Sequence, residues 1–175
     1  MVSPEVSASR LLSDSPVSVD DLREIALFGG LSDAVLEGFA QSLPTERFAP
    51  GDVVFAEGSS AHCLYVLLAG EVEVLKRARA GRDHRVAVLG PSDCFGEMSV
   101  VDVQPRSATV RVLAPSRALR VGSEDFDRLY RHDVKSYALM VLNIARDLSR
   151  RVRVADAILA EVAGAVIDRY GRPPQ

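Results

Sequence analysis

The chain has 175 residues, of which 47% are hydrophobic and 26% charged, and its formal net charge is −3 at pH 7. This length suits one domain with a sizeable core and a short appendage, and the slight acidity gives no overall attraction to nucleic acid. No apolar run approaches the roughly 18 residues that a membrane helix needs, and the N-terminus lacks a secretory signal. We therefore expect a cytoplasmic protein without a membrane segment.

The N-terminal part of the sequence predicts a disordered segment followed by two short helices. Residues 1–19 are rich in serine and lack apolar periodicity, which is typical of disorder. Residues 20–43 predict a helix, a turn and a second helix. Asp20 or Asp21 is expected to cap the first helix, and Ser32 the second.

Residues 45–121 consist of short β-like runs separated by glycine and proline. Eight strands are predicted, at residues 45–48, 53–55, 63–68, 71–76, 85–89, 94–95, 107–113 and 117–121. Many short strands with regular turns favour a sandwich or a jelly roll. Within the fourth strand, polar and apolar residues alternate at 71–74, which predicts one solvated face. Cys63 and Cys94 are expected to be reduced, buried thiols.

A compact group of polar residues lies between residues 95 and 110. Gly96 allows a ligand to approach the backbone closely, and Arg106 offers a fork of donors that suits a phosphate. The stretch between them predicts one or two helical turns, which Pro105 ends and whose first amides favour an anion. Glu97 would repel a phosphate, but it can accept a hydrogen bond from a sugar hydroxyl. A 3′,5′-cyclic nucleotide fits this combination.

The sequences Phe-Gly-Glu at 95–97 and Pro-Arg-Ser-Ala-Thr-Val at 105–110 resemble the phosphate-binding cassette of the cyclic nucleotide-binding domains. That family includes the catabolite activator protein and the regulatory subunits of protein kinase A. The resemblance implies that Glu97 binds the ribose 2′-hydroxyl. It also implies that Arg106, Ser107 and the backbone amide of Ala108 contact the cyclic phosphate.

The same resemblance implies the fold and the activity. The fold is expected to be mostly β, an eight-stranded β-roll over residues 20–133 with short N-terminal helices and a long C-terminal helix. Ser107 favours cyclic AMP as the ligand, because relatives with threonine at this place often accept cyclic GMP, which is the alternative. We expect a non-enzymatic receptor without a metal, in which ligand binding shifts the C-terminal helix and an unknown downstream protein detects the shift.

Residues 134–170 predict one long helix without proline, followed by a tail at 171–175. Its apolar residues form a heptad-like stripe at Val141, Ala145, Leu148, Val152, Ala155, Leu159, Val162 and Val166. In dimeric bacterial members of the resembling family this helix is the dimer seam, so a homodimer is expected. Arg146, Arg150 and Arg151 are expected to be solvated. Nothing after residue 170 predicts the helix-turn-helix of the family's transcription factors, so no DNA-binding domain is expected in this chain.

Two other functions remain open from the sequence. A cupin-like metal-dependent enzyme on a similar β-roll would need two or three histidines and a carboxylate around one ion. His62, His84 and His132 are scattered along the chain, which argues against it. The second alternative is a scaffold that keeps the fold but has lost the ligand, and the intact Glu97 and Arg106 argue against that.

Overall fold

A computed structural model describes residues 15–78 and 81–171. Three helical segments open this part of the chain: α2 (Val19–Arg23), the 3₁₀ helix η1 (Ala26–Phe28) and α3 (Asp33–Ser42). Ser18, rather than Asp20 or Asp21, caps α2. Its hydroxyl accepts from the Asp21 amide while the Asp21 carboxylate accepts from the Ser18 amide, so each residue satisfies a free donor of the other. Ser32 lies at the N-cap of α3, as predicted, without a side-chain capping bond.

Six strands form one antiparallel sheet in the order β1-β6-β3-β4, with β2 beside β6 and β5 beside β3. They are β1 (Thr45–Phe48), β2 (Val53–Phe55), β3 (Cys63–Arg77), β4 (Asp83–Leu89), β5 (Cys94–Phe95) and β6 (Thr109–Gly122). The mostly β class with flanking helices is confirmed, but the number of strands was wrong. Two long strands each run through a pair of predicted ones, at 63–68 and 71–76 in β3 and at 107–113 and 117–121 in β6.

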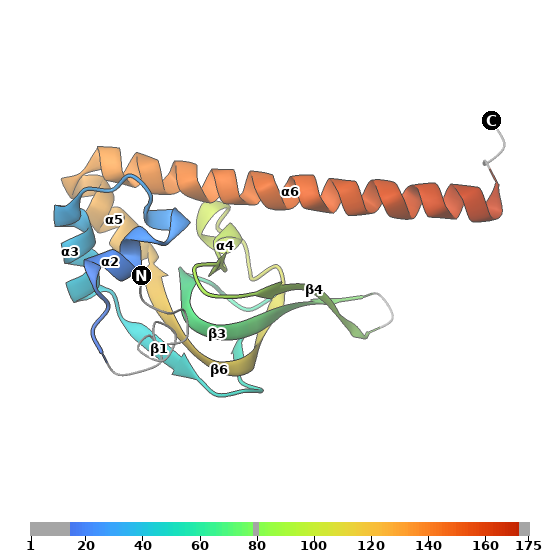
Figure 1. Cartoon of the computed structure of the whole chain (residues 1–175), viewed down its shortest axis with the longest axis horizontal. Helices are drawn as coiled ribbons and strands as arrows, with labels where there is room; N and C mark the ends of the chain where they lie inside the picture. The colour runs from blue at the N-terminus through green and yellow to red at the C-terminus, as the bar shows by residue number, and fades with distance from the viewer. Residues whose placement is uncertain (1–14, 79–80, 172–175) are drawn as a thin grey trace, which may run out of the picture.

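Irregular pairing, rather than a turn, separates the two halves of β3. The register of β3 against β6 shifts between Leu67 and Val72, and Gly70 has φ +95° inside this stretch. A Cβ at Gly70 would lie 2.2 Å from Ser116 Oγ, so only glycine lets β6 pass this closely. Such irregularities bend a strand and increase its twist without ending the pairing. The long strand can therefore curl into the roll seen in Figure 1.

The predicted solvated face at residues 71–74 was wrong at one position. Glu71 is exposed, but Glu73 is buried. Arg111 of β6 donates from Nε to the Glu73 carboxylate at 2.7 Å, and Arg85 of β4 pairs with it from the other side. A carboxylate can be buried in this way because two cations on neighbouring strands replace its water.

Three further helices complete the chain: α4 (Met98–Val101), α5 (Ser123–His132) and α6 (Val134–Tyr170). One apolar core lies between the N-terminal helices, α5, the first part of α6 and one end of the sheet, and a second lies inside the roll. Cys63 and Cys94 are buried free thiols, as predicted. None of the helices in the described residues is long and apolar enough to cross a membrane.

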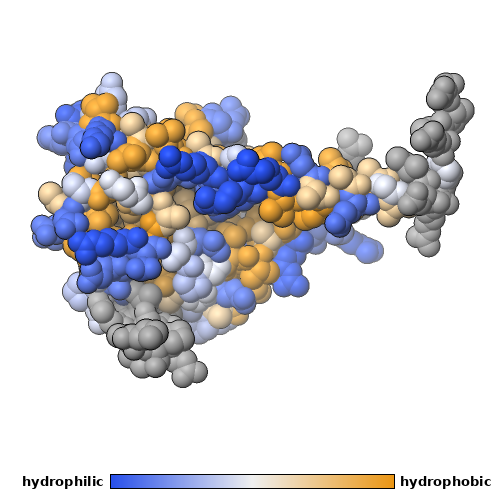
Figure 2. Space-filling model, turned by 45° about the horizontal axis from the view of Figure 1, so that its top comes forward, coloured by the Kyte–Doolittle hydropathy of each residue, from blue (hydrophilic) through white to orange (hydrophobic). Residues whose placement is uncertain are grey.

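Helix α6 extends far beyond the domain (Figure 1). Its first part packs on the domain through Met140 and Ile144, which are buried, and through Leu148. All side chains at residues 152–165 are exposed. Figure 2 shows apolar side chains on the surface of this extension.

Candidate functional site

The residues predicted to bind a ligand lie on the segment that joins β5 to β6. Helix α4 forms a single turn after Glu97 and ends at Val101, so Pro105 does not end it as predicted. The chain reverses instead at Val103, whose φ of +56° is unusual for a β-branched residue and incompatible with a continuing helix. Backbone hydrogen bonds then fasten Arg106 to the loop after β2, from Arg106 N–H to Ser59 O at 2.9 Å and from Gly58 N–H to Arg106 O at 2.8 Å.

The Arg106 side chain is only 5% exposed, and protein groups surround most of its guanidinium. Nη1 donates to the carbonyl of Gly96 at 3.0 Å, and Nη2 donates to Cys63 Sγ at 3.4 Å. The guanidinium carbon lies 3.9 Å from the centre of the Phe55 ring, a cation–π contact. Nε is buried and has no hydrogen-bond partner. The site therefore holds a buried positive charge with an unused donor, which an anion can satisfy.

Gly96 brings the backbone against this guanidinium. Its φ is +80°, and a Cβ added there would lie 2.3 Å from Arg106 Nη1. A side chain would therefore force the arginine out of its place. The sequence predicted glycine for close approach of a ligand, and the structure shows that the close neighbour is Arg106 itself.

Glu97 is 3% exposed, and its carboxylate is bound by a residue of α6. Arg151 Nη1 donates to Glu97 Oε1 at 3.2 Å, and the same guanidinium contacts the carbonyl of Cys94 and pairs with Asp147 at 2.7 Å. The expectation that Arg151 is a solvated helix charge was therefore wrong. The contact links the cassette to the long helix across 54 positions of sequence.

The pKa of the Glu97 carboxyl is raised above its ordinary value, because burial disfavours the charged form. The positive charges of Arg151 and Arg106 oppose this effect, and the negative charge of Asp147 adds to it. The neighbouring cations thus favour the charged form of this carboxyl group, against the effect of burial.

All five predicted residues line one cavity of about 90 Å³. Glu97 and Arg106 are buried, Gly96 and Ala108 are half-buried and Ser107 is exposed. Sequence reasoning missed the other lining residues, which are Phe55, Val74, Phe95, Met98, Ser99, Val110 and Arg151. Met98 and Ser99 could have been suspected, because they directly follow Glu97. No local sequence pattern indicated that Arg151 would line this cavity.

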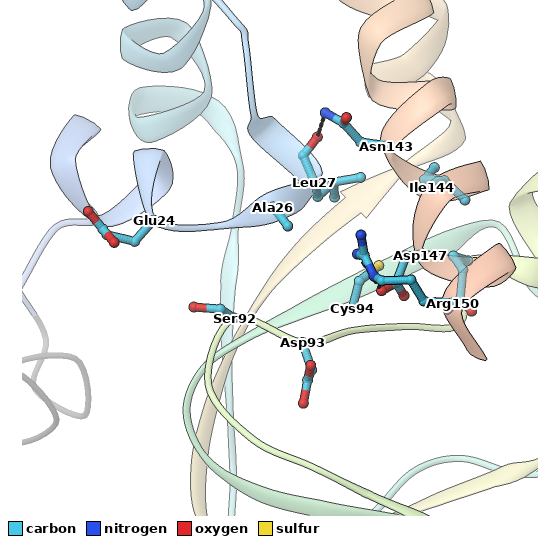
Figure 3. Close-up of a pocket in the computed structure, with 11 residues that line it drawn as sticks. Glu24, Ala26, Leu27, Ser92, Asp93, Cys94, Asn143, Ile144, Asp147 and Arg150 are labelled. Carbon is cyan, nitrogen blue, oxygen red and sulfur yellow. Dashed lines mark hydrogen bonds and ion pairs between the residues drawn. The ribbon is translucent and has the colours of Figure 1, made fainter. Parts of the chain in front are cut away.

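A second cavity, of about 290 Å³, lies behind the cassette (Figure 3). Helix α6, the segment around η1 and the loop before β5 enclose it, and Glu97 lines both cavities. On the α6 side, Asn143 donates to the carbonyls of Leu27 at 3.1 Å and Gly29 at 2.9 Å. Helix α6 thus lies partly over an open space rather than on a close-packed core.

Within residues 15–78 and 81–171, no group of three or more His, Cys, Asp and Glu residues is arranged to hold a metal ion. The described part of the chain therefore provides no set of metal ligands for the cupin-like enzyme that the sequence left open.

Comparison with known proteins agrees with this site. A family model described as "Cyclic nucleotide-binding domain" matches residues 45–133, which include the whole cassette. The chain therefore belongs to the cyclic nucleotide-binding domain family.

Three similar proteins can be named. The CRP-like cAMP-activated global transcriptional regulator of Mycobacterium tuberculosis is 32% identical over 150 residues, which are 83% of this chain and 65% of the relative. The cyclic AMP receptor protein of Thermus thermophilus is 30% identical over 130 residues, 74% of this chain and 58% of the relative. The solved N-terminal domain of a transcriptional regulator from Streptomyces coelicolor superposes with a TM-score of 0.67 at 31% identity, covering 75% of this chain and 94% of that domain. The chain thus spans about six tenths of the length of the two relatives compared by sequence.

Proposed function

We propose that this protein is a non-enzymatic receptor for a cyclic nucleotide, with cyclic AMP preferred over cyclic GMP. The observation that carries the proposal is the buried Arg106, which lines the cassette cavity and whose Nε has no hydrogen-bond partner. The two relatives compared by sequence are named for cyclic AMP, which supports the choice of ligand.

In this proposal each cassette residue has a separate task. Arg106 binds the cyclic phosphate, and the Ser107 hydroxyl and the Ala108 amide add hydrogen bonds to it. Glu97 accepts from the ribose 2′-hydroxyl, because a carboxylate cannot usefully face an anion. Gly96 leaves room for the Arg106 guanidinium, which keeps this side chain in place to bind the phosphate.

The size of the cavity supports a movement of α6 on binding. About 90 Å³ accommodates a phosphate and little more, whereas pockets that enclose a whole ligand are on the order of 300 Å³ or larger. The ligand must therefore enlarge the site. Arg151 of α6 lines it and holds the carboxylate that the ribose needs, and the second cavity gives α6 space to move. Binding then shifts α6, and a downstream protein detects the shift.

We further propose that residues 20–133 form the receptor domain and that α6 joins two copies of the chain. The exposed apolar side chains at 152–165 support the second part, since a patch of this kind usually marks an interface. A parallel pairing lets the same patch serve both subunits.

Calorimetry with cyclic AMP and cyclic GMP tests the proposal, with Arg106→Ala as the decisive variant. Removing one partner of a buried charged pair costs about 2–5 kcal/mol, so cyclic AMP affinity should fall by roughly 30- to several-thousand-fold. Arg128→Ala is the matched control, because it removes an exposed guanidinium on α5. If Arg106→Ala keeps its thermal stability and binds within about threefold of the parent, Arg106 is not the anchor. A folded parent that binds neither nucleotide would favour the scaffold that has lost its ligand.

The role of Glu97 can be tested with the 2′-deoxy analogue of cyclic AMP. Glu97→Ala should weaken binding of cyclic AMP far more than binding of the analogue, which already lacks the hydroxyl that Glu97 accepts from. Equal losses for the two ligands would show that Glu97 acts on another part of the nucleotide.

A further inference from the structure

Met98 lies at the mouth of the cassette cavity with its sulfur in contact with a proposed ligand-binding residue. It is the first residue of α4, its side chain is 44% exposed, and it lines the same cavity as Arg106. The Ser107 hydroxyl donates to Met98 Sδ at 3.5 Å. Nothing in the proposed binding of a cyclic nucleotide requires a thioether here.

We propose that Met98 is an oxidation site, at which a hydroperoxide forms methionine sulfoxide and thereby lowers the affinity for the cyclic nucleotide. The inference rests on the proposed function. In the reaction, the sulfur lone pair attacks the outer oxygen of the peroxide, an S–O bond forms and the O–O bond breaks. The sulfur is oxidised by two electrons, and hydrogen peroxide is reduced to water. The sulfoxide can be reduced again by methionine sulfoxide reductases.

The sulfoxide would act on the site through its oxygen. A thioether is a weak acceptor, so Ser107 can leave Met98 and turn to the phosphate at little cost. A sulfoxide is polar and a far better acceptor, so it would retain the Ser107 hydroxyl. Its negative end would also lie in the cavity that the anionic phosphate must enter, where repulsion adds to the lost hydrogen bond.

The other sulfur atoms in the described residues are less accessible to peroxide than that of Met98. Met140 is 1% exposed in the core, and Met1 lies outside the described residues. Cys63 and Cys94 are both buried. Burial also raises the pKa of the Cys94 thiol, which leaves little of the reactive thiolate. A cavity that accommodates a phosphate also admits hydrogen peroxide, and Met98 is the exposed sulfur among the described residues.

The experiment compares the full chain with Met98→Leu, a volume-conserving replacement that keeps both cysteines and Met140. Both proteins are treated with hydrogen peroxide, the oxidised residues are located by peptide mass spectrometry, and cyclic AMP binding is measured by calorimetry before and after. Peroxide should convert Met98 ahead of Met140. The parent's affinity should fall by roughly tenfold, the equivalent of one lost hydrogen bond. The affinity of Met98→Leu should be the same before and after peroxide treatment, and a methionine sulfoxide reductase should restore the affinity of the oxidised parent.

Three outcomes would overturn the inference. The parent with Met98 sulfoxide binds as tightly as before, or peroxide lowers the affinity of Met98→Leu to the same extent, or Met140 is oxidised before Met98. In each case the untreated parent still binds cyclic AMP, so the proposed function stands. An untreated parent that binds no cyclic nucleotide would overturn the proposed function, and with it the effect of Met98 oxidation on binding.

Discussion

The two halves of α6 carry similar apolar side chains but have different surroundings. In the first half, Met140 and Ile144 are buried in the domain core, and Asn143 binds two backbone carbonyls near η1. In the second half, every side chain at residues 152–165 is exposed, and Leu159 is 66% exposed. Arg151 lies at the boundary and contacts Glu97.

One continuous helix therefore passes from the apolar core of the domain into an exposed extension. The first half packs against the domain, which buries its apolar side chains Met140 and Ile144. The second half exposes Val152, Val154, Ile158, Leu159 and Val162, and we expect a partner to cover these apolar side chains. Since Arg151 joins the cassette at this boundary, a ligand that displaces it would act on the helix where the two environments meet.

The largest effect is expected from Leu159→Asp, which should convert the proposed dimer into a monomer. Burying a leucine side chain contributes roughly 1.5–3 kcal/mol, and the substitution removes two such side chains from each dimer. The dimer dissociation constant should therefore rise by roughly 10²- to 10⁴-fold. Light scattering at tens of micromolar protein, together with sedimentation equilibrium, measures the change.

Leu159→Met is the matched control, because it conserves volume and apolar character at the same position. It should remain dimeric. A parent that is already monomeric at this concentration would contradict the seam and leave the second half of α6 without the proposed partner.

The first half of α6 can be tested with Met140→Ala, which should destabilise the domain by about 2–5 kcal/mol because it leaves a cavity in the core. Leu159→Ala, measured at a concentration low enough for the monomer, should change the free energy of unfolding by less than about 0.5 kcal/mol, as exposed sites do. Urea denaturation of both variants gives the comparison. Equal losses would mean that the two halves of the helix do not differ as described.

The sequence predicted well what depends on local signals. Strands β1, β2 and β5 lie where turn residues and apolar runs placed them, and the whole of α6 follows its helical periodicity. The cassette was recognised for the same reason, because Gly96, Glu97 and Arg106 lie within eleven residues of sequence. The structure brings them around one cavity, and their roles toward a ligand remain predictions.

Features that depend on distant residues were not predictable in this way. Glu73 is buried because Arg111, 38 positions away, and Arg85 pair with it across the sheet. Gly70 suggested a turn between two strands. Strand β3 nevertheless continues past Gly70, because the residues after it also pair with β6. The domain-facing residues Met140 and Ile144 lie beside the predicted stripe rather than in it, since the surface that buries them comes from the N-terminal helices and the sheet. Arg151 likewise contacts Glu97 only in the folded protein, where the cassette lies beside α6.

The smallest expected effect is a pH dependence of cyclic AMP affinity, which arises from the contact between Arg151 and Glu97. Burial raises the pKa of Glu97, and the Arg151 guanidinium opposes the rise. An ionised carboxylate accepts a ribose hydroxyl more strongly than a protonated one. Cyclic AMP affinity should therefore be highest above the pKa of Glu97 and decline as the pH falls through it.

In Arg151→Ala the opposing charge is lost and the pKa of Glu97 rises further, so the decline should begin at a higher pH than in the parent. Calorimetry between about pH 5 and pH 8, which lies above the ordinary glutamate pKa of about 4.3, measures both profiles. The 2′-deoxy analogue should show little of this pH dependence, because it offers Glu97 no hydroxyl. Coincident profiles for Arg151→Ala and the parent would show that Arg151 does not control the ionisation of Glu97, and that its contact with the cassette serves only to hold α6 in place.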